Sequence, residues 1–331
     1  MFFDFLVRLI GIAFLNRFLN RSTATGLLGI EIGSTGIAVA HVTHPEQGRP
    51  VLQSCRFLPG DENDPPPLAA YIDEMGLKNC SCNVVLASNS YSLILTEAPT
   101  VEDDELADAM RWKMEELIDF PIEEAVLDVF RIPDDGSHGI TQMVYVTVAR
   151  RSLIEETVAL LKSSKLRVQS IDIIELALRN LSLLLTDKSL NDDQTAATQD
   201  SAGLTIVLLS PGSGNLNILK SQQLYLSRRF EIDWEGGLLD QLPANALALE
   251  LQRSLDYFEH QMNQTAPTRI FLCGTGVSED KLAGETQSNL FSALKVLPLG
   301  DLLELPEGCE ELSITNCIGA IGGALRESAS A

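Results

Sequence analysis

Residues 27–42 read LLGIEIGSTGIAVAHV, and this stretch decides the fold. Two apolar runs of strand length flank the turn-forming sequence GSTG at 33–36, so the stretch predicts a β-hairpin. The same order returns at residues 204–219, LTIVLLSPGSGNLNIL, with PGSG at 211–214 as the turn. A hairpin opening each half predicts two α/β halves of similar plan. If the two turns face one cleft, their backbone N–H groups and hydroxyls can bind phosphates, although Gly-rich hairpins occur in many sheets.

The composition is that of a globular chain with a large negative charge. The chain has 331 residues, enough for two domains or one large split one, and 45% of them are hydrophobic. Lys and Arg number 24 against 46 Asp and Glu, which gives a formal net charge of −22. Such a charge repels a phosphate backbone and no dense basic cluster occurs, so we expect no nucleic-acid partner. The six cysteines are scattered, which favours reduced thiols in a reducing compartment and disfavours a zinc site.

The N-terminal segment, residues 1–25, contains an amphipathic pattern. Residues 1–21 read MFFDFLVRLIGIAFLNRFLNR, in which the uninterrupted apolar run is too short to span a bilayer. The apolar positions share one face at helical spacing, and Arg17 and Arg21 are placed to meet lipid headgroups, as in a helix that lies in the membrane interface. The same pattern fits a helix that packs on the rest of the protein, or a start codon assigned too far upstream. We expect no transmembrane span in the rest of the chain.

The remaining sequence predicts strands and helices in an α/β order. Besides the two hairpins, the predicted strands are 83–87, 92–95, 144–149, 171–174, 223–227 and 269–273, and the predicted helices are 100–120, 153–161, 175–185, 246–262 and 315–326. The segment after Val42 is rich in prolines and acids and predicts a loop. A flexible loop is expected at 188–202, where the apolar periodicity is lost.

Gly29-Ile-Glu-Ile-Gly-Ser-Thr35 resembles the first phosphate loop of the actin, hexokinase and Hsp70 ATPases. Other segments resemble the PilM branch of that family, the actin-like cytoplasmic proteins of type IV pilus assembly. These segments are APTVEDDEL at 98–106, RWK at 111–113, FPIEE at 120–124, IDIIELAL at 171–178, the stretch from Arg229 to Gly236-Gly237, LELQRSLDYF at 249–258 and LCGTG at 272–276. Within the family the sequence looks closest to the branch that serves mannose-sensitive haemagglutinin (MSHA) pili.

The resemblance covers about residues 26–326 and implies an α/β, two-lobed actin-like ATPase fold with an inserted small α+β subdomain in the first lobe. The first part of that lobe is expected at 26–97 and the inserted subdomain at 98–171. The connecting helix and the second lobe follow at 172–331.

The resemblance also implies a set of site residues. The resemblance allows ATP with magnesium as a cofactor and leaves open whether it is bound; the residues that would bind it are Glu31, Gly33, Ser34, Thr35, Gly212, Ser213, Gly236, Gly237, Gly274, Thr275 and Gly276, with Glu31 as the magnesium ligand. Glu175, or Asp172, would position the attacking water. From the residues alone the alternatives stay open: Glu31 as a strand acid that pairs with a lysine, Glu175 as a solvated helix acid, and the glycines as marks of tight turns or close packing.

Four departures from the family pattern argue against catalysis. Family members carry Asp where this chain has Glu31, and Leu208 replaces the second acid, although leucine can neither ligate a metal nor orient water. In the second loop Ser210 stands where a glycine belongs, and Pro211 removes a backbone N–H that could face phosphate. We therefore expect hydrolysis to be absent or very slow.

Three functions are compatible with this sequence. The first is a scaffold of the inner-membrane platform for pilus assembly, which the resemblance implies would bind the cytoplasmic tail of a PilN-like bitopic membrane protein near the inserted subdomain. The second is the same scaffold switched by ATP, and the third is a small-molecule kinase on the same fold. We expect the scaffold, cytoplasmic and peripheral to the inner membrane, with a further membrane contact through residues 1–21.

Overall fold

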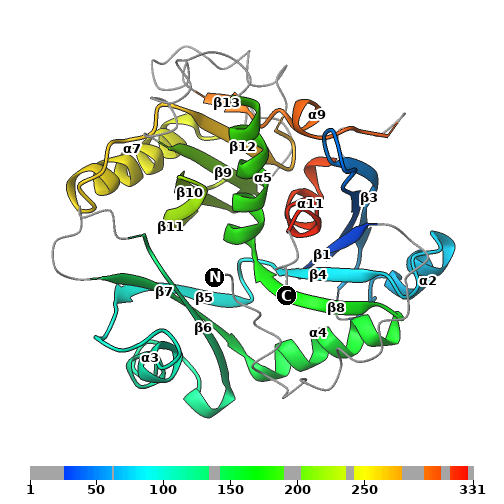
Figure 1. The fold of residues 1–331 in the computed structure, drawn as a ribbon, viewed down its shortest axis with the longest axis horizontal. Helices are drawn as coiled ribbons and strands as arrows, with labels where there is room; N and C mark the ends of the chain where they lie inside the picture. The colour runs from blue at the N-terminus through cyan, green and yellow to red at the C-terminus, as the bar shows by residue number, and fades with distance from the viewer. Residues whose placement is uncertain are drawn as a thin grey trace.

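The first large sheet begins with the hairpin that the sequence predicts. The computed structural model describes residues 26–61, 63–133, 142–189, 203–235, 242–277, 294–306 and 314–326. In it, the first large sheet has the strand order β3-β2-β1-β4-β8 (Figure 1). Its strands are β1 (Leu27–Gly33), β2 (Gly36–Thr43), β3 (Val51–Pro59), β4 (Ser81–Leu86) and β8 (Arg167–Ile173). The first three pair antiparallel, and β4 and β8 add in parallel.

The second large sheet repeats this plan. Its order is β11-β10-β9-β12-β13, again an antiparallel set of three to which two parallel strands add. The strands are β9 (Leu204–Ser210), β10 (Ser213–Lys220), β11 (Gln223–Glu231), β12 (Ile270–Gly274) and β13 (Leu294–Val296). The prediction of two halves of similar plan is therefore confirmed.

A small third sheet is inserted in the first half. It has the order β5-β7-β6, from β5 (Tyr91–Glu97), β6 (Ala125–Arg131) and β7 (Met143–Arg150). Helix α3 (Leu106–Met114) and the short 3₁₀ helix η2 (Ile122–Glu124) lie between β5 and β6 in the chain. The sheet and α3 enclose a core of their own, formed by Leu106, Met110, Met114, Ala125, Val129, Val144, Val146 and Val148.

The boundaries of this insertion differ from the expected 98–171. The small sheet already includes β5, which precedes residue 98, while β8, which begins inside the expected range at Arg167, belongs to the first large sheet. The sequence of a single strand does not reveal which sheet it joins, because that depends on a pairing partner that is distant in sequence. Strand β5 pairs with β7, and β8 pairs with β4.

Two helices lie between the large sheets. Helix α5 (Ile174–Ser189) contacts β8 and β4 on one side and β10 and β11 on the other, and α11 (Ile318–Ala324) packs against β1, β2, β4 and α5 (Figure 1). Small residues allow this approach: a Cβ on Gly322 would lie 2.3 Å from the Ala177 carbonyl oxygen, and one on Gly29 would lie 1.7 Å from that of Ala320. Gly322 of the closing helix and Gly29 of β1 therefore serve close backbone packing.

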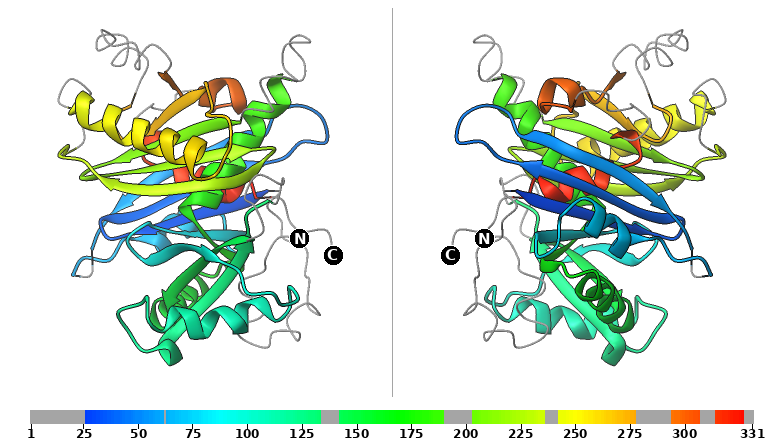
Figure 2. Two further views of the ribbon diagram at one scale, coloured as in Figure 1. Left: turned by 90° about the vertical axis from the view of Figure 1, so that its left-hand side faces the viewer. Right: turned by 90° about the vertical axis from the view of Figure 1, so that its right-hand side faces the viewer.

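The other named helices among the described residues are α2 (Leu68–Glu74), α4 (Arg151–Ser163), α7 (Ala244–His260) and α9 (Leu299–Leu302). Figure 2 shows α4 and the small sheet together at one end of the molecule and α7 at the other. Helix α4 packs on β7 and β8, and α7 packs on β11.

Two sequence expectations are corrected. The segment predicted as a loop after Val42 contains β3, whose partly exposed residues hide its alternation, and α3 ends at Met114, well before Pro121. Three predictions fall at least partly outside the described residues: the amphipathic segment 1–25, residues 190–202 of the expected flexible loop, and the glycine pair Gly236 and Gly237. The first two residues of that expected loop, 188 and 189, are the last two of α5.

Candidate functional site

The first hairpin turn places Ser34 and Thr35 on the surface and Glu31 against the closing helix. Gly33 pairs with Gly36, so Ser34 and Thr35 form the exposed tip of a tight turn. The Glu31 carboxylate accepts hydrogen bonds from the backbone N–H groups of Gly319 and Ala320. These groups are at the beginning of α11, where helix N–H groups lack partners within the helix. Glu31 therefore caps α11, and within the described chain its hydrogen-bond partners are amides, not a lysine.

Burial decides the protonation of Glu31. Loss of water around the carboxyl raises its pKa from 4.5 to about 7, although the two N–H groups favour the charged form and act in the opposite direction. Near neutral pH the group is therefore shared between its protonated and charged forms.

The second turn uses its own amide inside the fold. Gly212 has a positive φ of 76°, and its N–H donates to the Trp234 carbonyl at 2.7 Å. The Gly212 carbonyl in turn accepts from the Ile232 N–H at 3.1 Å. Since Pro211 has no N–H, the turn has lost two of the amides that a phosphate loop would offer. Ser213 begins β10, where it pairs with Ser210 and Glu231.

The turn after β12 has a structural reason for its first glycine. Gly274 has φ 115°, and a Cβ there would lie 2.0 Å from the Leu209 carbonyl oxygen, so only glycine lets β12 pass β9 at this point. Gly276 also has a positive φ, of 76°. The Thr275 hydroxyl hydrogen-bonds the side-chain oxygen of Asn316 at 3.0 Å, which ties the turn to the segment before α11.

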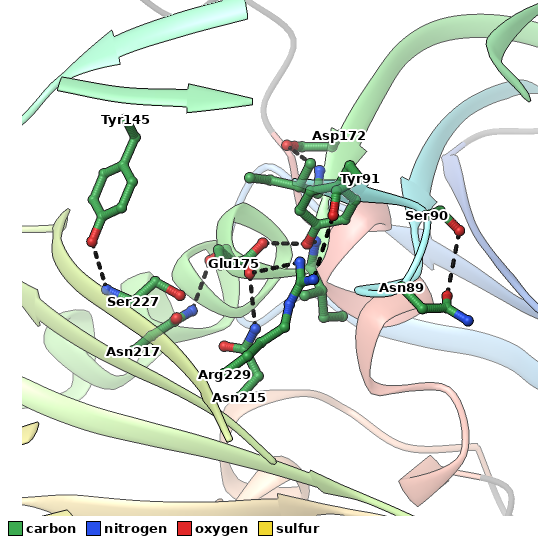
Figure 3. A network of polar contacts seen from close by, with 12 residues as sticks. Asn89, Ser90, Tyr91, Tyr145, Asp172, Glu175, Asn215, Asn217, Ser227 and Arg229 are labelled. Atoms are coloured by element: carbon green, nitrogen blue, oxygen red, sulfur yellow. Dashed lines mark hydrogen bonds and ion pairs between the residues drawn. The ribbon is translucent and has the colours of Figure 1, made fainter. Parts of the chain in front are cut away.

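Glu175, at the start of α5, is the centre of a buried polar network (Figure 3). Its side chain is 1% exposed. One carboxylate oxygen accepts the Tyr91 hydroxyl, and the other accepts the side-chain amide of Asn215 at 2.8 Å and lies 3.6 Å from the Arg229 guanidinium. The backbone carbonyl of Glu175 accepts the Asn217 amide at 3.2 Å. Glu175 is therefore not the solvated helix acid of the alternative hypothesis.

The network joins three parts of the molecule. Tyr91 is the first residue of the small sheet, α5 connects the halves, and Asn215 and Arg229 come from the second large sheet. The Arg229 guanidinium stacks over the Tyr91 ring at 4.7 Å from its centroid and donates to the Tyr91 carbonyl at 3.4 Å.

A second contact joins the small sheet to the second half. The hydroxyl of Tyr145 on β7 accepts the backbone N–H of Ser227 on β11 at 2.8 Å (Figure 3). Together with the Glu175 network, this hydrogen bond fixes the small sheet relative to the second large sheet.

Asp172, the other candidate for positioning water, has a structural partner. Its carboxylate lies 3.2 Å from the Arg326 guanidinium and accepts the Ile173 N–H at 2.9 Å. Burial raises the pKa of Asp172, and Arg326 acts against that rise. Asp172 thus ties the segment after α11 to β8.

Sequence reasoning missed Tyr91, Asn215, Asn217 and Arg229. The signal available was the pair of asparagines at alternate positions of a strand that is otherwise apolar, because buried amides need partners. Tyr91 and Arg229 carried no such signal, since their partner Glu175 is distant in sequence.

The described residues do not fit a magnesium site well. Glu31 is engaged by α11, and position 208, where the resemblance leads us to expect the second acid, is a leucine. Within the described ranges no group of three or more His, Cys, Asp or Glu side chains is placed to hold a metal ion. Octahedral magnesium needs oxygen ligands with little positional slack, and these residues do not supply them.

Two sheets of the same strand order, each opened by an antiparallel hairpin and separated by two helices, define the actin-like ATPase fold, and this chain has that fold. Residues 76–237, just under half of the chain, match the family model described as type IV pilus assembly protein PilM.

The solved structures with this fold include a "PilM-PilN type IV pilus biogenesis complex", to which the chain is 19% identical with a TM-score of 0.64. That match covers 91% of this chain and 98% of the other. The cytoplasmic domain of EpsL, an inner-membrane component of the type II secretion system of Vibrio cholerae, matches at 12% identity with a TM-score of 0.49, over 89% of this chain and 100% of that domain. No curated protein matches the chain significantly. None of the helices among the described residues is long and apolar enough to cross a membrane.

Proposed function

We propose that the protein is a PilM-like scaffold of the inner-membrane platform that assembles type IV pili. The observation that carries this proposal is the PilM family match across residues 76–237, which includes the whole small sheet and the Glu175 network. The likeness to the PilM-PilN complex over 91% of the chain supports it, since the chain keeps the architecture of a protein solved in that complex.

The proposed partner is the cytoplasmic tail of a PilN-like bitopic membrane protein. The small sheet with α3 is the proposed docking region, because it has its own core and is held to the rest by Tyr91 and Tyr145. The particular system we propose is the MSHA pilus, with the protein in the role of MshI. In this proposal the protein is cytoplasmic and peripheral to the inner membrane, and residues 1–21 add a lipid contact.

The scaffold is preferred to an ATP-driven switch because of three residues. Glu31 caps α11, the Gly212 amide is bonded to Trp234, and Leu208 replaces an acid. Each of them removes a group that phosphoryl transfer needs for charge stabilisation or positioning. The ATP-switched form remains a second candidate on one observation: the turn at Gly274–Gly276 keeps the positive φ angles of an adenosine loop.

A pull-down from membrane fractions tests the proposal. The purified full chain should capture a bitopic inner-membrane protein of the pilus platform equally well with and without ATP and magnesium. A synthetic cytoplasmic tail of the captured protein should bind in titration, and a scrambled tail of the same composition should not. Capture that needs ATP would establish the switched form, whereas phosphoryl transfer to a small hydroxylated acceptor with no captured protein would replace the scaffold by a kinase.

Deletion of residues 1–21 separates the two membrane contacts. The acidic chain is repelled by an anionic leaflet, and arginines near headgroups add only about 1 kcal/mol each, so the partner's tail should dominate recruitment. The deletion should reduce membrane association only partly in cells with an intact platform. A fully cytosolic deletion variant would contradict the partner-first model.

A further inference from the structure

The outer face of α3 presents an exposed tryptophan. Met110 lies on the inner face of the helix and is fully buried in the core of the small sheet. At about 100° per residue, Asp108, Trp112 and Glu115 fall on the side opposite Met110. The Trp112 side chain is 79% exposed, the largest value among the exposed large hydrophobic residues of the described chain. Tryptophan is highly buried on average, and it is enriched where proteins bind one another.

The sequence around Trp112 is strongly acidic, and only part of that charge is paired: Arg131 pairs with Asp103, and Arg150 pairs with Asp119 and Glu124. Residues 102–124 contain ten acidic residues and two basic ones. Both basic side chains turn back to the subdomain: Arg111 donates to the Ile122 carbonyl at 3.0 Å and Lys113 to the Glu97 carbonyl at 3.2 Å.

The carboxylates on the same side of α3 as Trp112 have no cationic partner among the described residues. They belong to Glu105, Asp108, Glu115 and Glu116, and all four are exposed. This acidic face, defined by these four residues and Trp112, is complementary to a segment that carries both cations and aromatic groups. An arginine placed over the indole would gain a cation–π contact as well as ion pairs with the flanking carboxylates.

Residues 1–21 of this chain have that chemistry. They contain Arg8, Arg17 and Arg21 against the single acid Asp4, together with five phenylalanines. The 25 residues before Gly26 can extend to about 85 Å, at about 3.3–3.6 Å per residue, whereas a compact chain of this length has a radius of gyration of about 20 Å. At the same rise per residue, Arg8 can lie up to about 60 Å from Gly26, Arg17 about 30 Å and Arg21 about 17 Å, so the Arg8 end of the segment has the reach to meet α3, and Arg17 and Arg21 join the contact as far as these spans allow.

We infer that, away from a lipid surface, residues 1–21 of this chain dock on the acidic face of α3. The arginines of the segment pair with the carboxylates of α3, and Trp112 contacts its cationic and aromatic side chains. The docked arginines are not available to lipid headgroups, so this contact and the lipid contact proposed above exclude each other. The inference does not depend on the pilus function.

The test is a charge swap in the full-length chain, without lipid, with Trp112 as the probe. The chain has two tryptophans, and the second, Trp234, is 3% exposed. Subtracting the signal of the matching Trp112→Phe variant isolates Trp112 in acrylamide quenching. Reversing Arg8, Arg17 and Arg21 to Glu should raise the quenching of Trp112 and shift its emission to longer wavelength. Since an exposed ion pair is worth at most a factor of about five, losing two pairs should weaken docking by up to about 25-fold.

Rescue locates the contact. Adding Asp108→Lys and Glu115→Lys to the arginine reversals should restore the protection of Trp112. The matched control adds Glu155→Lys and Glu156→Lys on α4, which change the net charge equally at exposed positions and should restore nothing. Equal quenching in the parent chain and the arginine-reversed variant would overturn the inference, and so would equal rescue by the α3 and α4 reversals.

Discussion

Removing the hydroxyl of Tyr91 should weaken the whole molecule, because that one group makes two buried hydrogen bonds. It donates to the Glu175 carboxylate and accepts the Ile174 N–H at 3.2 Å. A hydrogen bond to a charged group is worth about 1.5–3 kcal/mol, and a buried N–H left without an acceptor costs about 1–3 kcal/mol. Glu175 keeps Asn215 and Arg229, so its charge is not left alone. The two contributions together lead us to expect that Tyr91→Phe lowers the free energy of unfolding by about 2.5–6 kcal/mol.

Urea unfolding followed by circular dichroism measures this loss, with Tyr257→Phe as the matched control. The Tyr257 side chain is 39% exposed, so loss of its hydroxyl should change the free energy of unfolding by no more than about 0.5 kcal/mol. A local measurement accompanies the global one: hydrogen exchange of the Ile174 amide should become faster in Tyr91→Phe, since that N–H has lost its acceptor. If Tyr91→Phe and Tyr257→Phe lose the same stability, the Glu175 network does not hold the halves together.

Three further changes test the site. The folded-state pKa of Glu31 is raised to about 7, so the folded protein binds the proton more tightly than the unfolded chain does. The free energy of unfolding should therefore fall as the pH rises from about 5 to 8. Glu31→Gln should flatten that fall in unfolding experiments across this pH range. Gly322→Ala puts a Cβ 2.3 Å from a carbonyl oxygen of α5, so it should lower the free energy of unfolding in urea by about 1–3 kcal/mol. In the control Gly300→Ala, the new Cβ meets only the tip of a leucine side chain at 3.5 Å, so the free energy of unfolding should be unchanged or higher. The parent chain should show no robust magnesium-dependent ATP hydrolysis in a phosphate-release assay, and Leu208→Asp should, if anything, raise it; rapid turnover in the parent would refute the argument from Leu208.

The repeated hairpins could be predicted because their information is local. A turn sequence between two apolar runs specifies strand, turn and strand without help from the rest of the chain, and both hairpins formed as expected. The strand β3 was missed for the opposite reason. Its pattern of exposed and buried residues is irregular, and it becomes a strand because β2 offers a free edge to pair with.

The site was harder to predict because its residues are used by neighbours that the sequence does not reveal. Glu31 could be identified as an acid at the end of a strand, but its role depends on α11, almost 290 residues away in the chain. Glu175 was placed correctly at the start of a helix, yet whether it is solvated depends on Tyr91, Asn215 and Arg229. Hydropathy patterns report burial and periodicity, but not which buried polar groups will meet.

Glu31 and Glu175 together suggest how this chain differs mechanically from an actin-like switch. In a nucleotide-driven protein of two lobes, the acids beside the phosphates change partners as the nucleotide changes, and that change biases one of two arrangements. Here Glu31 is bonded to α11, and Glu175 joins α5 to the small sheet and to the second large sheet. Glu31 is thus committed to α11 within the first half, and Glu175 to contacts between the halves, so moving the halves apart would break the hydrogen bond from Asn215 and the ion pair with Arg229. Such an arrangement favours one rigid geometry, which is the property that a scaffold needs for holding a partner's tail.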